Sequence, residues 1–224
     1  IPLNVQKYIR VNGVPRQSSQ LVGHVTAVLF TALDMELVTG SPSARRRYLD
    51  ILLCLLEMEY LKTLRRYQRI ITQRNYLLRQ ARDVNPRVVQ ELRFWNEELA
   101  KNGAVIVEHR IRAMNFLSTR ASITYGNLSN NGEDLSLEYI CNPDMDGITS
   151  RAVIEEKLLT ALEEQQAREV NAGLSLVGPH RDDIQFRIDG ILGGIYGSRG
   201  QARSIALALR LAEAEFLREE KGET

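Results

Sequence analysis

The sequence has little cysteine and no long apolar run. Cys54 and Cys141 are its only cysteines, and neither has a metal-ligand spacing or a partner that would imply a disulfide framework. The longest apolar runs, such as residues 51–56, fall far short of the roughly 20 residues that span a bilayer. No basic-then-apolar signal peptide opens the chain. These absences predict a cytoplasmic protein that is neither secreted nor membrane-bound.

Net charge is also nearly absent, at +1, which alone would argue against a nucleic-acid partner. The charges are nevertheless unevenly distributed along the chain. Basic residues outnumber acidic ones over residues 45–93, and acidic residues outnumber basic ones over residues 133–169. One part of the chain therefore suits a polyanion and the other does not.

Strand-like segments occur near both ends of the chain and helical segments in the middle. Residues 8–11 alternate as a strand, break at the turn signal Asn12-Gly13, and a second strand is expected at residues 25–30. Pro42 predicts the start of a helix that runs to about residue 82. Pro86 separates it from a second long helix to about residue 117, with Gly103 as a weak point. The two would form an antiparallel helical hairpin.

The rest of the chain predicts short strands and two more helices. Strands are expected at residues 135–139, 174–177 and 184–188. Ser150 predicts the cap of a helix that ends near Gly173, and a last helix covers about residues 199–219. This order fits an α/β body that is interrupted by a helical insertion.

Residues 197–201, Gly-Ser-Arg-Gly-Gln, open the last helix. Ser198 and Gln201 have the spacing of a capping box, which satisfies two backbone donors without any ligand. That explanation leaves Gly200 unaccounted for, because glycine in the first turn weakens a helix by about 1 kcal/mol relative to alanine. Glycine lets a ligand approach the backbone, and the helix N-terminus, Arg199 and Arg203 all favour an anion. Simple capping and phosphate binding both remain open.

Four blocks of the sequence point to one family. Residues 197–213 carry a Ser-x-Gly-Gln core followed by a helix rich in alanine and leucine, and residues 43–50, 67–75 and 177–183 precede them at characteristic spacings. In this order and spacing the chain resembles RecF, a family of DNA-repair ATPases of the ABC type. The family's Phe-x-Pro-Glu-Asp-Leu loop reads Phe-Thr-Ala-Leu-Asp-Met at residues 30–35, so Asp34 matches, and a nucleotide-sensing role for Leu33 is left without support.

The resemblance implies an α/β fold: an ABC-type ATPase head with a mixed sheet and helices, interrupted by a mostly helical lobe. Residues 1–40 and 173–224 would belong to the ATPase domain, and residues 41–172 to the lobe. Two subunits would enclose two ATP molecules, so that Ser198, Arg199, Gly200 and Gln201 of one subunit meet the γ-phosphate held by the other. ATP would thereby control the stability of a homodimer.

The family also implies a role in DNA replication, repair and the SOS response at the nucleoid. RecF proteins would bind gapped DNA and single/double-strand junctions and, with RecR and indirectly RecO, place RecA on single strands. They would use ATP and Mg²⁺ as weak DNA-dependent ATPases. The sequence contains no Gly-x-x-x-x-Gly-Lys-Ser/Thr motif. We therefore expect an internal fragment with no catalytic or metal-binding residue, which neither holds ATP stably nor hydrolyses it.

Two further groups of residues are candidates for contacts. The candidates for DNA or partner binding are Arg45, Arg46, Arg47, Lys62, Arg66 and Arg69. The first three lie in the first turn of a predicted helix, where the helix dipole disfavours cations, so phosphate contact and a structural ion-pair role are both open. The last three share one helical face, for which a solvated surface is the simpler explanation.

The loop at residues 178–183 contains His180, Arg181 and Asp182. Its structural explanation is a tight turn in which Arg181 pairs with Asp182 or Asp183. The resemblance instead places it near the nucleotide or the dimer seam. For the whole chain, the alternative to a DNA-gated ATPase is a helical protein-docking module of a chromosome-maintenance ATPase, with no DNA contact of its own and with arginines facing an acidic partner such as RecR.

Overall fold

The computed structural model describes residues 8–16, 27–81, 86–129 and 132–222, with only the backbone described for residues 86–89. The elements in chain order are β1 (Arg10–Val11), β2 (Val14–Pro15), the 3-10 helix η2 (Ala32–Asp34), α1 (Met35–Thr39), α2 (Pro42–Leu56), α3 (Met58–Gln80), α4 (Pro86–Leu128), β3 (Leu135–Ile140), α5 (Arg151–Ala172), β4 (Asp183–Ile188), β5 (Ile191–Leu192), α6 (Gly193–Tyr196) and α7 (Arg199–Lys221). This mixture confirms the predicted α/β class with a helical middle. Within the described residues, no helix combines the length and the apolar character needed to cross a bilayer.

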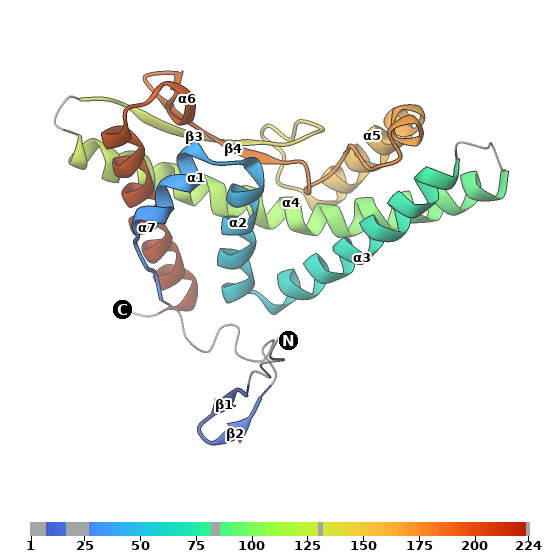
Figure 1. The fold of residues 1–224 in the computed structure, drawn as a ribbon, viewed down its shortest axis with the longest axis horizontal. Coiled ribbons are helices and arrows are strands. Elements are labelled where there is room, and N and C mark those ends of the chain that lie inside the picture. Colours follow the sequence, from blue (N-terminus) through green and yellow to red (C-terminus); the bar gives the residue numbers. More distant parts are fainter. Residues whose placement is uncertain (1–7, 17–26, 82–85, 130–131, 223–224) are drawn as a thin grey trace, which may run out of the picture.

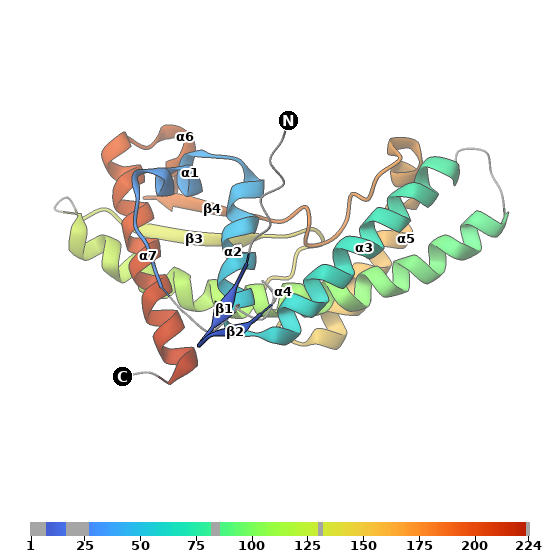
Figure 2. The same cartoon turned by 60° about the horizontal axis from the view of Figure 1, so that its bottom comes forward.

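The 43-residue helix α4 runs through the whole molecule. One end of α4 packs against α3 and α5, and the other end packs against α7 and the sheet (Figures 1 and 2). The predicted weak point at Gly103 does not break the helix. A Cβ built there would lie 3.2 Å from the Leu158 side chain and 3.4 Å from that of Tyr67, so glycine allows α3 and α5 to approach α4 closely.

The prediction of a single long helix between residues 42 and 82 is wrong, because the structure has two helices that are divided at Glu57. Glu57 has an extended backbone (φ −128°, ψ 114°) and caps both α2 and α3. Its carboxylate accepts hydrogen bonds of 2.7 Å from His109 and Arg112 of α4. Contacts from a distant helix therefore fix the break, while the apolar spacing continues across it.

Strands β3, β4 and β5 form one antiparallel sheet in that order. Leu137 lies opposite Phe186, and the buried residues of β3 and β4 face the core. Asp189 (φ 49°) and Gly190 (φ 79°) make the turn into β5, a strand that the sequence pattern did not predict. Strand β3 falls within the predicted lobe, residues 41–172, and β4 falls within the predicted ATPase part, residues 173–224, so the sheet joins the two. The domain boundaries themselves stay a prediction.

Of the expected strands, residues 174–177 and the described part of residues 25–30 are irregular. Residues 12–13 do form a tight turn, with Asn12 at φ 50° and Gly13 at φ 81°, but the chain pairs at once as β1 with β2. Residues 25–26 of the expected second strand lie outside the described residues, and residues 27–30 are irregular.

The strand expected at residues 174–177 is an irregular segment held by side chains. The Ser175 amide donates to Asn75 of α3 (2.7 Å), and the Leu176 amide donates to Glu169 of α5 (2.7 Å). These carboxylate and amide oxygens replace the neighbouring strand that a sheet would supply.

Candidate nucleotide-contacting loop and basic groove

The candidate signature loop, residues 197–201, joins α6 to α7. Gly197 is extended (φ −70°, ψ 148°), and a Cβ there would lie only 2.4 Å from the carbonyl oxygen of Gly193. The first glycine of the loop is thus required by the turn that ends α6. Gly200 is different, because a Cβ there would meet only the Ser198 hydroxyl at 3.7 Å, an ordinary contact.

Ser198 and Gln201 form the capping box that their spacing indicates. The backbone N–H of Gln201 donates to the Ser198 Oγ at 3.1 Å, and the backbone N–H of Ser198 donates to the side-chain oxygen Oε1 of Gln201 at 2.7 Å. The side-chain nitrogen Nε2 of Gln201 donates to the Glu133 carboxylate at 2.9 Å. Glu133 also accepts a hydrogen bond of 2.6 Å from Tyr125, near the end of α4. The loop is therefore bonded both to itself and to the longest helix.

The outer face of the loop is open. Ser198, Arg199, Gly200 and Arg203 are all exposed. The amides of residues 199 and 200 lie in the first turn of a 23-residue helix, where no carbonyl four residues earlier can accept them. Exposed amides, a hydroxyl and two guanidinium groups at a helix N-terminus can bind a phosphate group.

The loop at residues 178–183 is packed against α3 rather than open. Gly178 has φ 118°, and a Cβ there would lie 2.4 Å from the Tyr67 hydroxyl. Tyr67 bonds His180 Nδ1 at 2.9 Å, and His180 Nε2 donates to the Ser175 carbonyl at 3.1 Å. Burial lowers the pKa of His180 to about 4, so the ring is neutral at pH 7. Arg181 bonds the Ser175 carbonyl at 2.7 Å.

Arg181 does not pair with either aspartate, so that expectation is wrong. Asp182 is buried and bonded to Tyr139, and it lies 3.5 Å from the buried Arg110 of α4. Burial outweighs these partners and raises the pKa of Asp182 to about 6. Asp183 pairs with Arg45 instead.

The first-turn arginines of α2 meet this same loop. Arg45 is buried and makes a two-pronged ion pair with Asp183, at 2.6 and 2.9 Å, and it also donates to the Gly40 carbonyl at 2.7 Å. Arg46 donates to the Asp182 carbonyl at 2.7 Å. Arg47 is exposed. The structural ion-pair role therefore accounts for Arg45 and in part for Arg46, and only Arg47 remains fully free for an external contact.

The chain was compared with known proteins. No family model matches the chain. The DNA replication and repair protein RecF of Chloroflexus aggregans is 42% identical over 226 residues, which cover 99% of this chain and 58% of that protein. RecF of Herpetosiphon aurantiacus is 39% identical over 218 residues, covering 97% and 55%. A solved structure of the recombination mediator protein RecF-ATPrS in the RecFOR pathway superimposes with a TM-score of 0.91 at 32% identity, covering 99% and 59%.

The chain belongs to the RecF family. It spans a little over half the length of the curated RecF relatives that it matches, 58% for the Chloroflexus protein. A second solved structure, of RecF-ATP, has a TM-score of 0.90 and covers 98% of this chain and 58% of that one. One of these RecF structures is of RecF-ATPrS and the other of RecF-ATP.

Leu33 is one of the positions at which this RecF chain departs from the family pattern. Its side chain is 72% exposed, while the matching Asp34 is 6% exposed. Arg210 of α7 donates to Asp34 at 2.6 Å, and the Thr31 amide donates at 2.5 Å. Burial raises the pKa of Asp34, but the Thr31 amide and Arg210 together hold it below its usual value. Asp34 therefore links residues 31–34 to α7, the helix that follows the signature loop.

A groove between α2 and α3 contains some of the exposed basic residues. It has a volume of about 1060 Å³, and its lining includes Arg46, Arg47, Arg65, Gln68 and His180. The predicted stripe of Lys62, Arg66 and Arg69 lies on α3 and is exposed. Arg66 pairs with Glu98 of α4 at 2.6 Å. In the described part of the chain, no ion pair involves Arg47, Lys62, Arg65 or Arg69.

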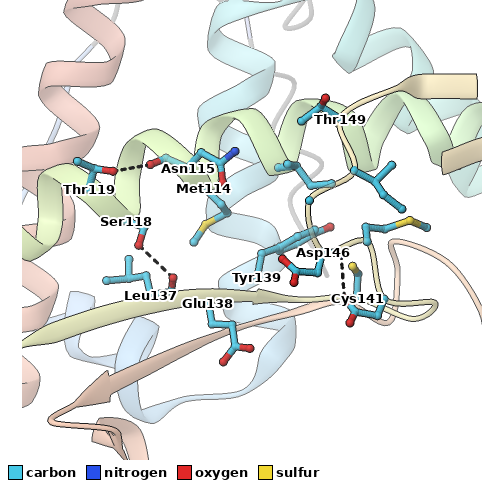
Figure 3. Close-up of a pocket in the computed structure, with 15 residues that line it drawn as sticks. Met114, Asn115, Ser118, Thr119, Leu137, Glu138, Tyr139, Cys141, Asp146 and Thr149 are labelled. Atoms are coloured by element: carbon cyan, nitrogen blue, oxygen red, sulfur yellow. Dashed lines mark hydrogen bonds between the residues drawn. The ribbon is translucent and has the colours of Figure 1, made fainter. Parts of the chain in front are cut away.

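The two predicted loops do not come together within this chain. No hydrogen bond or ion pair in the described ranges joins residues 197–201 to residues 178–183. A second groove, between α4, β3 and residues 144–149, contains none of the predicted residues (Figure 3). Of the described residues, no group of three or more histidine, cysteine or acidic side chains could hold a metal ion.

Sequence patterns missed the residues that hold the site from within. Arg74 and Arg110 are almost fully buried, and both lie at apolar positions of their helices. Arg110 donates to the Pro179 carbonyl and to Asp50, at 2.7 and 2.8 Å, and so fixes the loop at residues 178–183. Basic residues at helix positions that are otherwise apolar were the signal that could have revealed them.

Proposed function

We propose that this chain supplies the signature loop of a RecF-type ATPase, which contacts ATP held by a second subunit. The observation that carries the proposal is the open N-terminus of α7, where Ser198, Arg199 and Gly200 are exposed while the capping box fixes the backbone. The Ser198 Oγ accepts from Gln201, so its own hydrogen is left to donate to a phosphate oxygen. The similarity to the RecF-ATP structures supports the same assignment.

Gly200 supports contact from outside the chain. Nothing in the described residues requires the absence of a Cβ there, and alanine would favour the helix by about 1 kcal/mol. A phosphate group that approaches the first-turn amides would explain the glycine, because a methyl group would stand in its path.

The residues fit the phosphate part of ATP but not its metal ion. Mg²⁺ prefers carboxylate, phosphate and water oxygens. Glu133, the carboxylate bonded to this loop, is already occupied by Tyr125 and Gln201. Mg²⁺ and the rest of the nucleotide would be held by the other subunit, so ATP would strengthen the dimer and its hydrolysis would weaken it.

By the same proposal the protein acts in DNA repair, at gaps and single/double-strand junctions, and assists RecA loading with RecR and RecO. The groove residues Arg47 and Arg65 and the α3 residues Lys62 and Arg69 are exposed and would contact DNA phosphates. Such contacts release counterions, which makes the affinity fall steeply with salt.

The signature assignment is tested in a full-length RecF protein that carries this chain. Ser198→Arg places a bulky side chain where the phosphate would lie, so nucleotide-dependent dimerisation should be lost in sedimentation experiments. Ala214→Arg is the matched control, since it adds the same side chain at an exposed position of the same helix. Dimerisation that survives Ser198→Arg at the level of the control would reject the assignment.

The groove is tested by the double charge reversal Arg47→Glu and Arg65→Glu in the same protein. Affinity for gapped DNA should fall more than tenfold, and the slope of log affinity against log salt should decrease by about two. Arg168→Glu on the acidic helix α5 serves as the control. Weakened RecR binding with unchanged DNA binding would instead favour the docking module, and no change in either would leave only a solvated surface.

A further inference from the structure

The signature loop is held in place by one residue of α4 and one residue just before β3. Tyr125 is 1% exposed and lies in the last turn of α4. Glu133 lies just before β3, and its two carboxylate oxygens have separate partners. Oε2 accepts from the Tyr125 hydroxyl at 2.6 Å, and Oε1 accepts from the Gln201 side-chain nitrogen at 2.9 Å.

This arrangement fixes the orientation of the Gln201 side-chain amide, that is, which partner its nitrogen and its oxygen each meet. An ionised carboxylate can only accept hydrogen bonds, so Glu133 must meet the nitrogen of Gln201. The Gln201 oxygen is then directed at the Ser198 amide, which donates to it at 2.7 Å. Without Glu133 the side chain could rotate about its terminal bond, and the Ser198 amide would lose its acceptor in a fraction of the molecules.

We infer that Tyr125 and Glu133 are positioning residues, which hold Gln201 and Ser198 in the arrangement that meets ATP across the dimer seam. This role rests on the proposed function of the loop. Neither residue needs to touch the nucleotide, because each acts through Gln201. The same long helix holds the loop at residues 178–183 through Arg110. Helix α4 therefore connects the helical lobe to the nucleotide-contacting loop.

The experiment measures ATP-dependent dimerisation and ATP binding to the monomer in a full-length RecF protein that carries this chain. Tyr125→Phe removes one donor, and Glu133→Gln lets either its oxygen or its nitrogen face Gln201, so the Gln201 side-chain amide is no longer held in one orientation. One lost hydrogen bond should weaken dimerisation roughly 3- to 10-fold. ATP affinity of the monomer should stay unchanged, since the loop contacts nucleotide only across the seam.

A conservative variant separates positioning from general damage. Glu133→Asp keeps a carboxylate, which like that of Glu133 only accepts hydrogen bonds, so it should retain more of the dimerisation than Glu133→Gln does. Glu156→Gln, which removes the same charge from an exposed position of α5, should have no effect. If Tyr125→Phe and Glu133→Gln both dimerise like the parent while Ser198→Arg abolishes dimerisation, the positioning role is overturned and the signature assignment stands. If Ser198→Arg also dimerises normally, both are rejected.

Discussion

The buried ion pair between Arg74 and Glu169 offers a strong test of what holds the helical lobe together. Both side chains are fully buried, and Arg74 Nη2 lies 2.5 Å from the Glu169 carboxylate. Arg74 also donates to Asn96 of α4 and to Ser175, each at 2.8 Å. One guanidinium group thus joins α3, α4, α5 and the segment before residue 178.

Arg74→Met fills the same space but leaves the Glu169 carboxylate buried without its cation. Removing one partner of a buried pair costs about 3–5 kcal/mol, a large part of the roughly 5–15 kcal/mol that stabilises a folded protein. Arg66→Met is the matched control. Arg66 also pairs with a glutamate at 2.6 Å, but its side chain is 63% exposed, so its loss should cost less than about 1 kcal/mol.

Urea unfolding of the purified chain, followed by the fluorescence of Trp95, measures both costs. Trp95 is the only tryptophan and packs beside Leu78 and Leu92. Adding Glu169→Gln to Arg74→Met removes the unpaired charge while keeping an acceptor for the Leu176 amide, so part of the stability should return. Equal, small losses for Arg74→Met and Arg66→Met would refute the reasoning.

Three other outcomes are expected. His180 is buried and neutral with a pKa of about 4, against 6.5 when unfolded, so the stability it contributes is complete above pH 6.5 and is lost as pH falls towards 4. His180→Gln should reduce this acid-induced loss in urea unfolding at pH 7.5 and 5. Arg45→Met should cost about 2–4 kcal/mol and Arg47→Met less than 0.5 kcal/mol in the same assay, because only Arg45 is buried and ion-paired. Gly197→Ala should lower the melting temperature, since its Cβ would meet a backbone oxygen at 2.4 Å, whereas Gly200→Ala should raise stability by up to about 1 kcal/mol and weaken ATP-dependent dimerisation.

Local patterns predicted much of the fold. Local patterns placed α5 and α7 close to their observed bounds, and the Ser-x-x-Gln spacing predicted the capping box. Their determinants lie within one or two helical turns of the residue concerned. Such features need no knowledge of what packs beside them.

The missed features depend on residues far apart in the sequence. Glu57 breaks a helix because α4 supplies its hydrogen-bond donors. Residues 174–177 resemble a strand by composition, but Glu169 and Asn75 satisfy their amides. The basic surplus over residues 45–93 included Arg45 and Arg74, which are buried and paired. Charges can be counted from the sequence, but which of them form ion pairs depends on residues that only the fold brings together.

The central claim is that the signature loop meets the γ-phosphate of ATP held by another subunit. Its most direct test is photo-crosslinking with an ATP analogue that carries the reactive group on the γ-phosphate, using a full-length RecF protein that contains this chain. We expect the label on residues 198–203, with a yield that rises with protein concentration as dimers form. Labelling of other residues alone, or a yield at residues 198–203 that does not change with protein concentration, would contradict the claim.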